Sequence, residues 1–264
     1  GFKKQTARLR NGLPQITSCL LSLGFMKQEI PLTNGKKIYF ASDNHLGAPC
    51  AAESLPREKK FVSWLDTIKD SAAAIFLLGD LFDFWFEYKT VVPKGFTRTL
   101  GKLAELSDAG IPIYYFVGNH DLWMHGYFEE ELGIQVFHKP QEFIIENKTF
   151  LIGHGDGLGP GDKGFKRMKK VFTNPIAKWF FKWLHPDIGV ALGHYLSVKN
   201  KLISGEEDVV FLGEDQEWLV QYAKKKLTEQ HYDFFVFGHR HLPLEIAVAE
   251  NATYVNTGDW ISQY

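Results

Sequence analysis

Residues 72–80 read AAAIFLLGD, an apolar run that ends in Gly79 and Asp80. A continuous apolar run of this length is typical of a strand buried on both faces, as in a parallel sheet. Four other stretches end in the same way, with a small residue and then a potential ligand: FASD (40–43), FVGN (116–119), LIGH (151–154) and VFGH (236–239). Ligands of α/β sheets bind beyond the carboxyl ends of the strands, so the five ends indicate one shared site.

Outward from these ends, short apolar runs alternate with segments of helical spacing. We expect strands at 36–41, 72–78, 111–117, 142–145, 149–152, 233–237, 244–248 and 253–256, and helices at 56–69, 96–109, 122–132 and 215–230. The first three strands are each followed by a helix, whereas the later ones form hairpin-like pairs. This mixture predicts parallel βαβ units joined to a second, more antiparallel sheet.

Composition excludes several classes of protein. The chain has 264 residues, 45% of them hydrophobic, and a net charge of −1, so binding of nucleic acid by a general basic surplus is not expected. Two cysteines cannot form a disulfide framework, which predicts a reducing, cytoplasmic location. No apolar stretch approaches the roughly 18 to 20 residues that span a bilayer.

The amino-terminal region differs from the remainder of the chain. Residues 1–25 carry four basic side chains before a weakly apolar stretch that polar residues interrupt, and no cleavage site of a secretory signal follows. We therefore expect residues 1–35 to form an N-terminal tail and residues 36–264 to form one domain.

The five strand ends carry five short motifs. Each alone is compatible with a turn, because Asp, Asn and Gly are common there. All five together, in order and after apolar runs, favour a binding site. The motifs are Asp43-x-His45, Gly79-Asp80-x-x-Asp83, Gly118-Asn119-His120-Asp121, Gly153-His154-Gly155-Asp156 and Gly238-His239-x-His241.

Their side chains suit two divalent cations. Carboxylate, imidazole and amide oxygen, without any thiolate, favour Mn, Fe or Zn over softer metals. A spacing of two residues lets both members of a pair reach one side of an extended segment. If one carboxylate bridges the two metals, each metal receives four protein ligands and keeps open positions for water and substrate. The seven candidate ligands are Asp43, His45, Asp80, Asn119, His154, His239 and His241.

The charge of such a site indicates its chemistry. Two dications, two carboxylates and a bridging hydroxide leave a net charge of about +1, which attracts an anion. Paired metals also acidify a bridging water and hold the oxygens of an in-line displacement. The pattern therefore predicts hydrolysis at phosphorus.

The five motifs resemble the signature of the calcineurin-like metallophosphoesterases over roughly residues 36–259. The resemblance implies a four-layer αββα sandwich of two mixed β-sheets with a helical insertion. It also implies that Asp43, His45 and His241 hold one metal, that Asn119, His154 and His239 hold the other, and that Asp80 bridges them. His120 would stabilise the phosphoryl charge or protonate the leaving group, and Asp121 would orient it. An Asx-type turn is the alternative interpretation of His120 and Asp121.

A basic and aromatic stretch lies between the fourth and fifth motifs. Residues 163–201 contain nine Lys or Arg against one acid, Asp187, together with seven aromatic residues, and Pro175 and Pro186 interrupt the helical spacing. This composition suits a surface that meets anionic lipid headgroups and acyl chains. We therefore expect a substrate- and membrane-facing insertion at about 163–202. An amphipathic cap over the core and a nucleic-acid surface are the alternatives.

Within the family, the chain most resembles the UDP-2,3-diacylglucosamine diphosphatases of lipid A biosynthesis. The stretches GDLFDFW (79–85) and HGDGL (154–158), with Asp162 eight residues after His154, carry that resemblance. His120 and Lys163 depart from the pattern, in which Arg and an acid are expected. The resemblance implies a glycolipid nucleotide substrate, Mn²⁺ as the metal with Fe²⁺ or Zn²⁺ as alternatives, and a location on the cytoplasmic side of the inner membrane. Substrate contacts are expected from Asp162, Lys199 and Lys201.

Two other functions stay open. A soluble phosphatase or phosphodiesterase that acts on a nucleotide or a phosphoprotein would carry the same metal ligands. A binding scaffold of the same fold is the third hypothesis, although scaffolds typically lose metal ligands and all seven positions are filled here. The sequence does not determine the oligomeric state.

Overall fold

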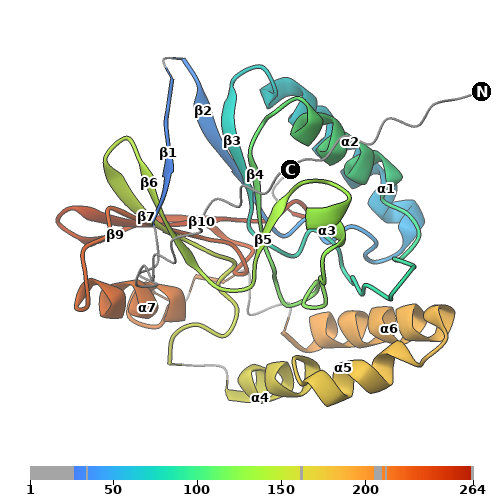
Figure 1. The fold of residues 1–264 in the computed structure, drawn as a ribbon. Coiled ribbons are helices and arrows are strands. Elements are labelled where there is room, and N and C mark those ends of the chain that lie inside the picture. Colours follow the sequence, from blue (N-terminus) through green and yellow to red (C-terminus); the bar gives the residue numbers. More distant parts are fainter. Residues whose placement is uncertain (1–26, 34, 161–162, 205–209, 212, 263–264) are drawn as a thin grey trace, which may run out of the picture.

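The computed structural model describes residues 27–33, 35–160, 163–204, 210–211 and 213–262. These residues form two β-sheets that pack face to face, with helices on both outer sides (Figure 1). Three further helices form a separate layer beside one end of the sandwich (Figure 1).

The first sheet has four parallel strands. Its order is β2 (Lys37–Ala41), β3 (Ala72–Leu77), β4 (Ile113–Phe116) and β5 (Gln135–Phe137). Helices α1 (Ala51–Ile68) and α2 (Thr97–Asp108) connect successive strands and bury residues such as Phe61, Leu65 and Leu103 against the outer face. The predicted parallel βαβ units are confirmed.

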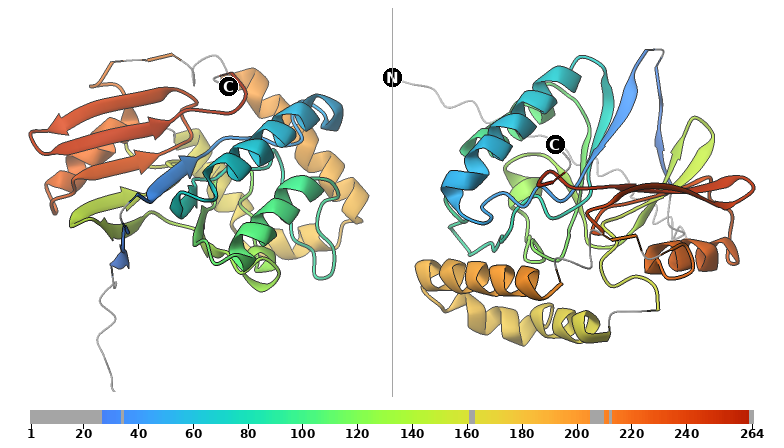
Figure 2. Two further views of the ribbon diagram at one scale, coloured as in Figure 1. Left: turned by 90° about the horizontal axis from the view of Figure 1, so that it is seen from above. Right: turned by 180° about the vertical axis from the view of Figure 1, so that it is seen from behind.

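The second sheet has six strands in mixed orientation. Its order is β1 (Gln28–Ile30), β6 (Gln141–Ile145), β7 (Lys148–Ile152), β8 (Phe234–Phe237), β10 (Ala252–Thr257) and β9 (Pro243–Ala249). The β6–β7 and β9–β10 pairs are antiparallel, as the hairpin-like spacing predicts. Helix α7 (Trp218–Leu227) covers the outer face through Leu219, Val220 and Ala223 (Figure 2).

The two sheets share an apolar core. Side chains that alternate along β3 point into it, because successive residues of a strand face opposite sides. Phe76 stacks on Phe40 and on Tyr114, with ring centroids 5.1 and 5.0 Å apart, and meets Phe143 of the other sheet edge-on at 5.0 Å. The order of layers is helix, sheet, sheet, helix, which confirms the four-layer αββα sandwich.

Three elements differ from the sequence prediction: α3 is shorter than expected, and β1 and β5 form where no strand was expected. A helix over 122–132 is wrong: α3 spans only Tyr127–Glu130. The backbone at 125–127 is hydrogen-bonded to a neighbouring loop instead. The carboxylate of Glu87 in that loop accepts hydrogen bonds from the amides of His125 at 2.5 Å and Tyr127 at 3.2 Å. In addition, β1 pairs with β6 and lies inside the range expected to form a tail.

The helical insertion forms what we call the lid, residues 163–204. It comprises α4 (Lys163–Phe172), α5 (Pro175–Lys182) and α6 (Pro186–Ser204), which lie below the sandwich in Figure 1, with α4 and α5 in a row and α6 above them. Proline starts α5 and α6, where its fixed φ suits the first turn of a helix. Helix α6 packs closely on the core: a Cβ at Gly193 would lie 2.2 Å from the ring of Phe84.

Candidate metal centre

The structure brings all seven predicted ligands together where five strands end. Their groups meet in pairs: Nε2 of His241 lies 3.3 Å from Oδ1 of Asp43, and Nε2 of His154 lies 3.4 Å from Oδ2 of Asp80. Nε2 of His154 also lies 3.1 Å from Oδ1 of Asn119. Three sets of three side chains have ligand atoms within 4.8 Å of one another: Asp43, His45 and His241; His45, Asp80 and His120; and Asp80, His154 and His239.

An unusual backbone holds these side chains in place. Five of the seven residues have φ between 43° and 71°, in the left-handed region that costs a non-glycine residue about 1–3 kcal/mol. Close approach of the loops also requires glycine. A Cβ at Gly118 would lie 2.2 Å from Oδ1 of Asp80, and a Cβ at Gly238 would lie 2.6 Å from Oδ2 of Asp43. The five residues are Asp43, His45, Asp80, His239 and His241.

Three histidines present the same nitrogen to the centre. Nδ1 of His154 lies 2.6 Å from the carbonyl oxygen of Leu78, Nδ1 of His241 lies 3.5 Å from Asp259, and Nδ1 of His45 lies 3.5 Å from Asp83. Metal-binding histidines commonly engage their outer nitrogen with such an acceptor, which leaves Nε2 for the metal. Nε2 of His45 and His241 are 3.1 Å apart.

The buried carboxylates of the cluster favour positive charge on the groups beside them. Burial opposes ionisation of Asp43, but His241 outweighs it and lowers the pKa of that carboxyl to about 2. Burial likewise disfavours charged His154, yet Asp80 and Asp43 raise its pKa to about 10. His241 behaves in the same way beside Asp259 and Asp43, and its pKa rises to about 10. Without a metal, two imidazolium groups therefore balance the buried carboxylates.

The residues fit a pair of divalent ions. Oδ1 of Asp43 is buried and faces Nε2 of His241 at 3.3 Å and Nε2 of His45 at 3.9 Å. A cation bound by this oxygen and by Nε2 of His45 and His241 would satisfy all three atoms and displace the proton on His241. The donor set of carboxylate, imidazole and amide, without thiolate, suits Mn, Fe or Zn.

His120 lies at the edge of the cluster and touches the lid. Its backbone amide donates to Oδ1 of Asp80 at 2.8 Å, and its Nδ1 lies 2.9 Å from the carbonyl oxygen of Asp83 and 3.1 Å from Oγ of Ser197. Because a carbonyl oxygen only accepts, Nδ1 carries a hydrogen and Nε2 is the nitrogen left for a substrate. Ser197 in turn donates to Oδ2 of Asp83 at 2.8 Å.

Asp121 does not orient His120 in the way the sequence suggested. Its carboxylate accepts hydrogen bonds from the amides of Gly118 at 2.6 Å and Leu81 at 3.1 Å and from the hydroxyl of Tyr115. Burial, with the nearby charge of Asp80, raises the pKa of Asp121 to about 7. Asp121 thus fixes the backbone of the loop that carries the ligands.

Some predicted residues lie outside the described part of the chain. Asp162 is not described, and the side chains of Lys199 and Lys201 are not described either. Conversely, sequence reasoning did not single out Ser197 or Asp259. Asp259 had a signal, because it follows a strand and a glycine as the other site residues do, whereas Ser197 had none.

Comparison with known proteins places the chain among phosphoesterases. A family model described as calcineurin-like phosphoesterase matches residues 36–243. A UDP-2,3-diacylglucosamine hydrolase of Porphyromonas gingivalis is 38% identical over 238 residues, which cover 85% of this chain and 90% of that protein. A UDP-2,3-diacylglucosamine hydrolase of a Shewanella species is 25% identical over 224 residues, covering 85% of this chain and 90% of that protein.

Solved structures also match. A dimetal phosphatase from Danio rerio has 11% sequence identity and a TM-score of 0.37, with 87% of this chain and 89% of that chain covered. A Vps29 single mutant from Entamoeba histolytica has 12% identity and a TM-score of 0.39, with 86% and 76% covered.

Proposed function

The chain belongs to the calcineurin-like phosphoesterase family, and we propose that it hydrolyses the pyrophosphate of UDP-2,3-diacylglucosamine to UMP and 2,3-diacylglucosamine 1-phosphate. The convergence of seven metal-binding side chains at the strand ends carries the proposal that this is a two-metal hydrolase. The 38% identity to a UDP-2,3-diacylglucosamine hydrolase over most of both chains supports the substrate.

We assign the ligands as follows. Asp43, His45 and His241 would hold one metal, Asn119, His154 and His239 would hold the other, and Asp80 would contribute to both. When bound, the metals acidify water and neutralise charge on the phosphoryl oxygens. The hard and borderline donors suit Mn²⁺, Fe²⁺ or Zn²⁺, and we propose Mn²⁺ among these because of the resemblance to the UDP-2,3-diacylglucosamine diphosphatases.

The protein's own residues position the reacting groups. His120, fixed at Nδ1 by Asp83 and Ser197, presents Nε2 to the phosphoryl group. A protonated Nε2 would stabilise charge on that group or give its proton to the leaving oxygen as the P–O bond of the pyrophosphate breaks. The other product oxygen comes from water.

The lid supplies a site for the lipid half. A cavity of about 60 Å³ lies between the lid and the core beside Asn119 and His120, and its apolar wall includes Phe84, Leu122, Trp123, Met168, Phe172 and Leu196. This volume holds only about five water molecules, so α6 has to move away from the core before acyl chains enter.

The outer face of the lid supports association with a membrane surface. Ile176, Trp179, Phe180 and Trp183 of the α5 region are 54–74% exposed, and Lys182 lies among them. Tryptophan and lysine together suit the headgroup region of an anionic bilayer. No helix of the described residues is long and apolar enough to span a bilayer. The exposed aromatic and lysine side chains of the lid support our proposal of a peripheral location on the cytoplasmic face of the inner membrane.

The substrate is tested by UMP release from two compounds. Manganese-loaded protein should release UMP from UDP-2,3-diacylglucosamine at least about a hundredfold faster than from UDP-N-acetylglucosamine, because the acyl chains supply binding energy that the lid uses. The Asp80→Asn variant is the control for metal-dependent hydrolysis. Equal rates on both compounds would favour a soluble phosphatase or phosphodiesterase with a broader substrate range.

Membrane association is tested separately by flotation. Vesicles that contain phosphatidylglycerol should carry the wild-type protein, and a Trp179→Ser/Trp183→Ser variant should float at least about fivefold less. Ile261→Ser, which removes a 44%-exposed apolar side chain from the surface outside the lid, is the matched control. Flotation that is equal for all three proteins would contradict the assignment of the membrane-facing surface.

A further inference from the structure

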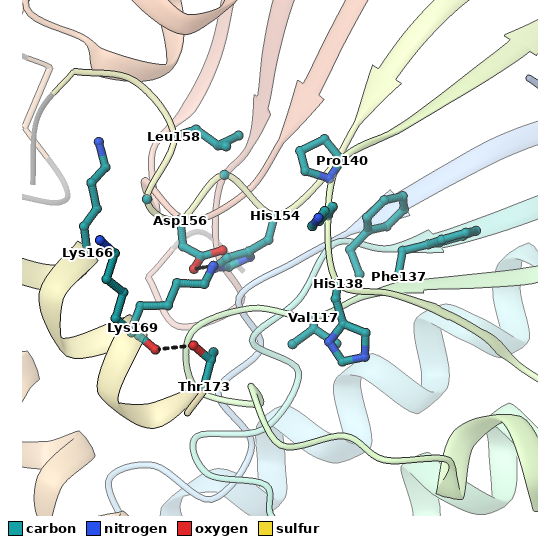
Figure 3. Close-up of a pocket in the computed structure, with 15 residues that line it drawn as sticks. Val117, Phe137, His138, Pro140, His154, Asp156, Leu158, Lys166, Lys169 and Thr173 are labelled. Carbon is teal, nitrogen blue, oxygen red and sulfur yellow. Dashed lines mark hydrogen bonds and ion pairs between the residues drawn. The ribbon is translucent and has the colours of Figure 1, made fainter. Parts of the chain in front are cut away.

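A second and larger cavity lies on the other side of His154. Its volume is about 470 Å³, and its lining includes His154, Asp156, Leu158 and Thr173. Figure 3 shows Lys166 and Lys169 of α4 on one side, Phe137, His138 and Pro140 on the opposite side, and His154 with Asp156 between them. Of the seven predicted metal ligands, His154 belongs to the lining of this cavity.

Helix α4 separates this cavity from the one under the lid. Lys166, Lys169, Lys170 and Thr173, at positions i, i+3, i+4 and i+7, line the 470 Å³ cavity. Met168 and Phe172 line the 60 Å³ apolar cavity. Because residues three and four apart share a face of a helix, α4 presents a cationic face to one cavity and an apolar face to the other.

The substrate that we propose has the same division. A pyrophosphate lies between a hydrophilic nucleoside and a doubly acylated sugar, so an enzyme that holds the pyrophosphate at the metals has to accept the two halves on different sides. The apolar cavity next to His120 suits the acylated half. We propose that the 470 Å³ cavity is the subsite for the nucleoside monophosphate half, an assignment that rests on the proposed function.

The charges around the cavity suit a phosphate group. Lys139, Lys166, Lys169 and Lys170 lie along its walls, against the single carboxylate of Asp156. Lys169 already pairs with Asp156, and Nζ of Lys166 donates to the carbonyl oxygen of Gly159 at 2.5 Å. Lys170 is exposed to solvent at the rim. A phosphate would exchange the weak contact of Lys166 with a neutral carbonyl for a charge-assisted hydrogen bond.

The apolar part of the lining suits a nucleobase. Phe137 and His138 supply rings on one wall, and Pro140 and Leu158 supply aliphatic surface. Surfaces of this kind can stack on any nucleobase. A bound uracil would need only a few polar contacts in addition. The volume lies in the range of about 300–1,000 Å³ that is usual for small-ligand sites.

The test compares the binding of product halves by calorimetry. Manganese-loaded protein is titrated with UMP, ribose 5-phosphate, inorganic phosphate and 2,3-diacylglucosamine 1-phosphate. We expect UMP to bind at least about tenfold more tightly than ribose 5-phosphate or phosphate, because both the base and the phosphate are held. We also expect Leu158→Glu and Lys166→Ala/Lys170→Ala to weaken UMP binding by about tenfold or more.

The controls separate the subsite from general effects. Lys60→Ala removes an exposed lysine from α1 and should leave UMP affinity within about twofold of the wild type. Both cavity variants should bind 2,3-diacylglucosamine 1-phosphate within about threefold of the wild type, since that half lies beyond α4. UMP that binds no more tightly than inorganic phosphate would show that the metals alone capture the anion and would overturn the proposal.

Failure of the subsite is distinguishable from failure of the proposed function. If the protein hydrolyses UDP-2,3-diacylglucosamine but the cavity variants bind UMP as the wild type does, the subsite is wrong and the activity stands. If UMP binding depends on the cavity while UDP-2,3-diacylglucosamine is not hydrolysed, the nucleotide subsite is supported and the lipid substrate is wrong.

Discussion

A buried ion pair secures the loop that carries two predicted metal ligands. Arg240, between His239 and His241, donates from Nε and from one terminal nitrogen to the two carboxylate oxygens of Glu217, both at 3.0 Å. The same terminal nitrogen donates to the carbonyl oxygen of Val210 at 2.9 Å. Arg240 and Glu217 are 1% and 0% exposed. We predict that Glu217→Ala destabilises the protein and weakens metal binding.

The size of the effect follows from burial. Removal of one partner leaves the other charge in a medium of low dielectric constant, which typically costs about 3–5 kcal/mol. That is a large fraction of the roughly 5–15 kcal/mol by which domains are stable. If the free energy of unfolding falls by about 3 kcal/mol for each molar of urea, the urea concentration at the midpoint of unfolding should fall by about 1 M or more.

Unfolding of the metal-free protein in urea measures this directly. The chain has seven tryptophans, so intrinsic fluorescence reports the transition. Glu214→Ala is the matched control, because its carboxylate is 55% exposed and lies 3.9 Å from Lys224, and it should change stability by less than about 1 kcal/mol. A loss below about 1 kcal/mol for Glu217→Ala would refute the reasoning.

A double variant distinguishes the lost pair from lost packing. Glu217→Leu/Arg240→Met removes both charges, so no unpaired charge remains, and it should be more stable than Glu217→Ala. Manganese affinity should fall in both, since the left-handed backbone at His239 and His241 loses the anchor between them. Affinity equal to the wild type would show that the ligand loop does not need this pair.

Three further predictions concern the site and the lid. Asp80→Ala should lower the bound manganese by about one ion per chain in elemental analysis, and unchanged content would remove Asp80 from the bridging role. The pKa values of His154 and His241 are raised to about 10, so both are protonated in the metal-free protein at neutral pH and lose a proton on loading. Manganese affinity should therefore rise between about pH 6 and pH 9. Calorimetry in buffers of different ionisation enthalpy should show protons released as manganese binds. If no protons are released, the raised pKa values are contradicted. Gly193→Val adds a Cβ that would lie 2.2 Å from the ring of Phe84, so α6 could no longer pack on the core as it does. The KM for the lipid substrate should rise at least about tenfold, and proteolysis of the lid should become faster. Wild-type values for both would show that α6 does not pack against Phe84.

The fold was largely predictable because its strands carry two signals at once. Five apolar runs, such as 72–78, end in a small residue and a potential ligand, so for these strands the pattern of apolar residues and the boundary agree. The prediction of a helix at 122–132 was wrong because the apolar residues at its start are buried side chains of a loop. Leu122 is 8% exposed and Met124 2% exposed, although neither is helical. Glu87, distant in sequence, decides the conformation there.

Some residues of the candidate site could be predicted from the sequence next to them, whereas others depend on contacts between distant parts of the chain. The seven predicted ligands follow strands, so their convergence was implied by the topology of the sheets. The contacts of Ser197 with Asp83 and His120 were not, because they depend on how the insertion folds back over the core. The spacing of Asp121 beside His120 suggested a contact that the structure replaces with bonds to Tyr115 and the loop backbone.

The position of α4 between two cavities has a consequence for turnover. The same helix forms a wall of both the 470 Å³ and the 60 Å³ cavity, so a displacement that widens one reshapes the other. The two products would then not depart independently: escape of the water-soluble nucleotide and return of the acylated sugar to the bilayer would be kinetically linked through a single helix.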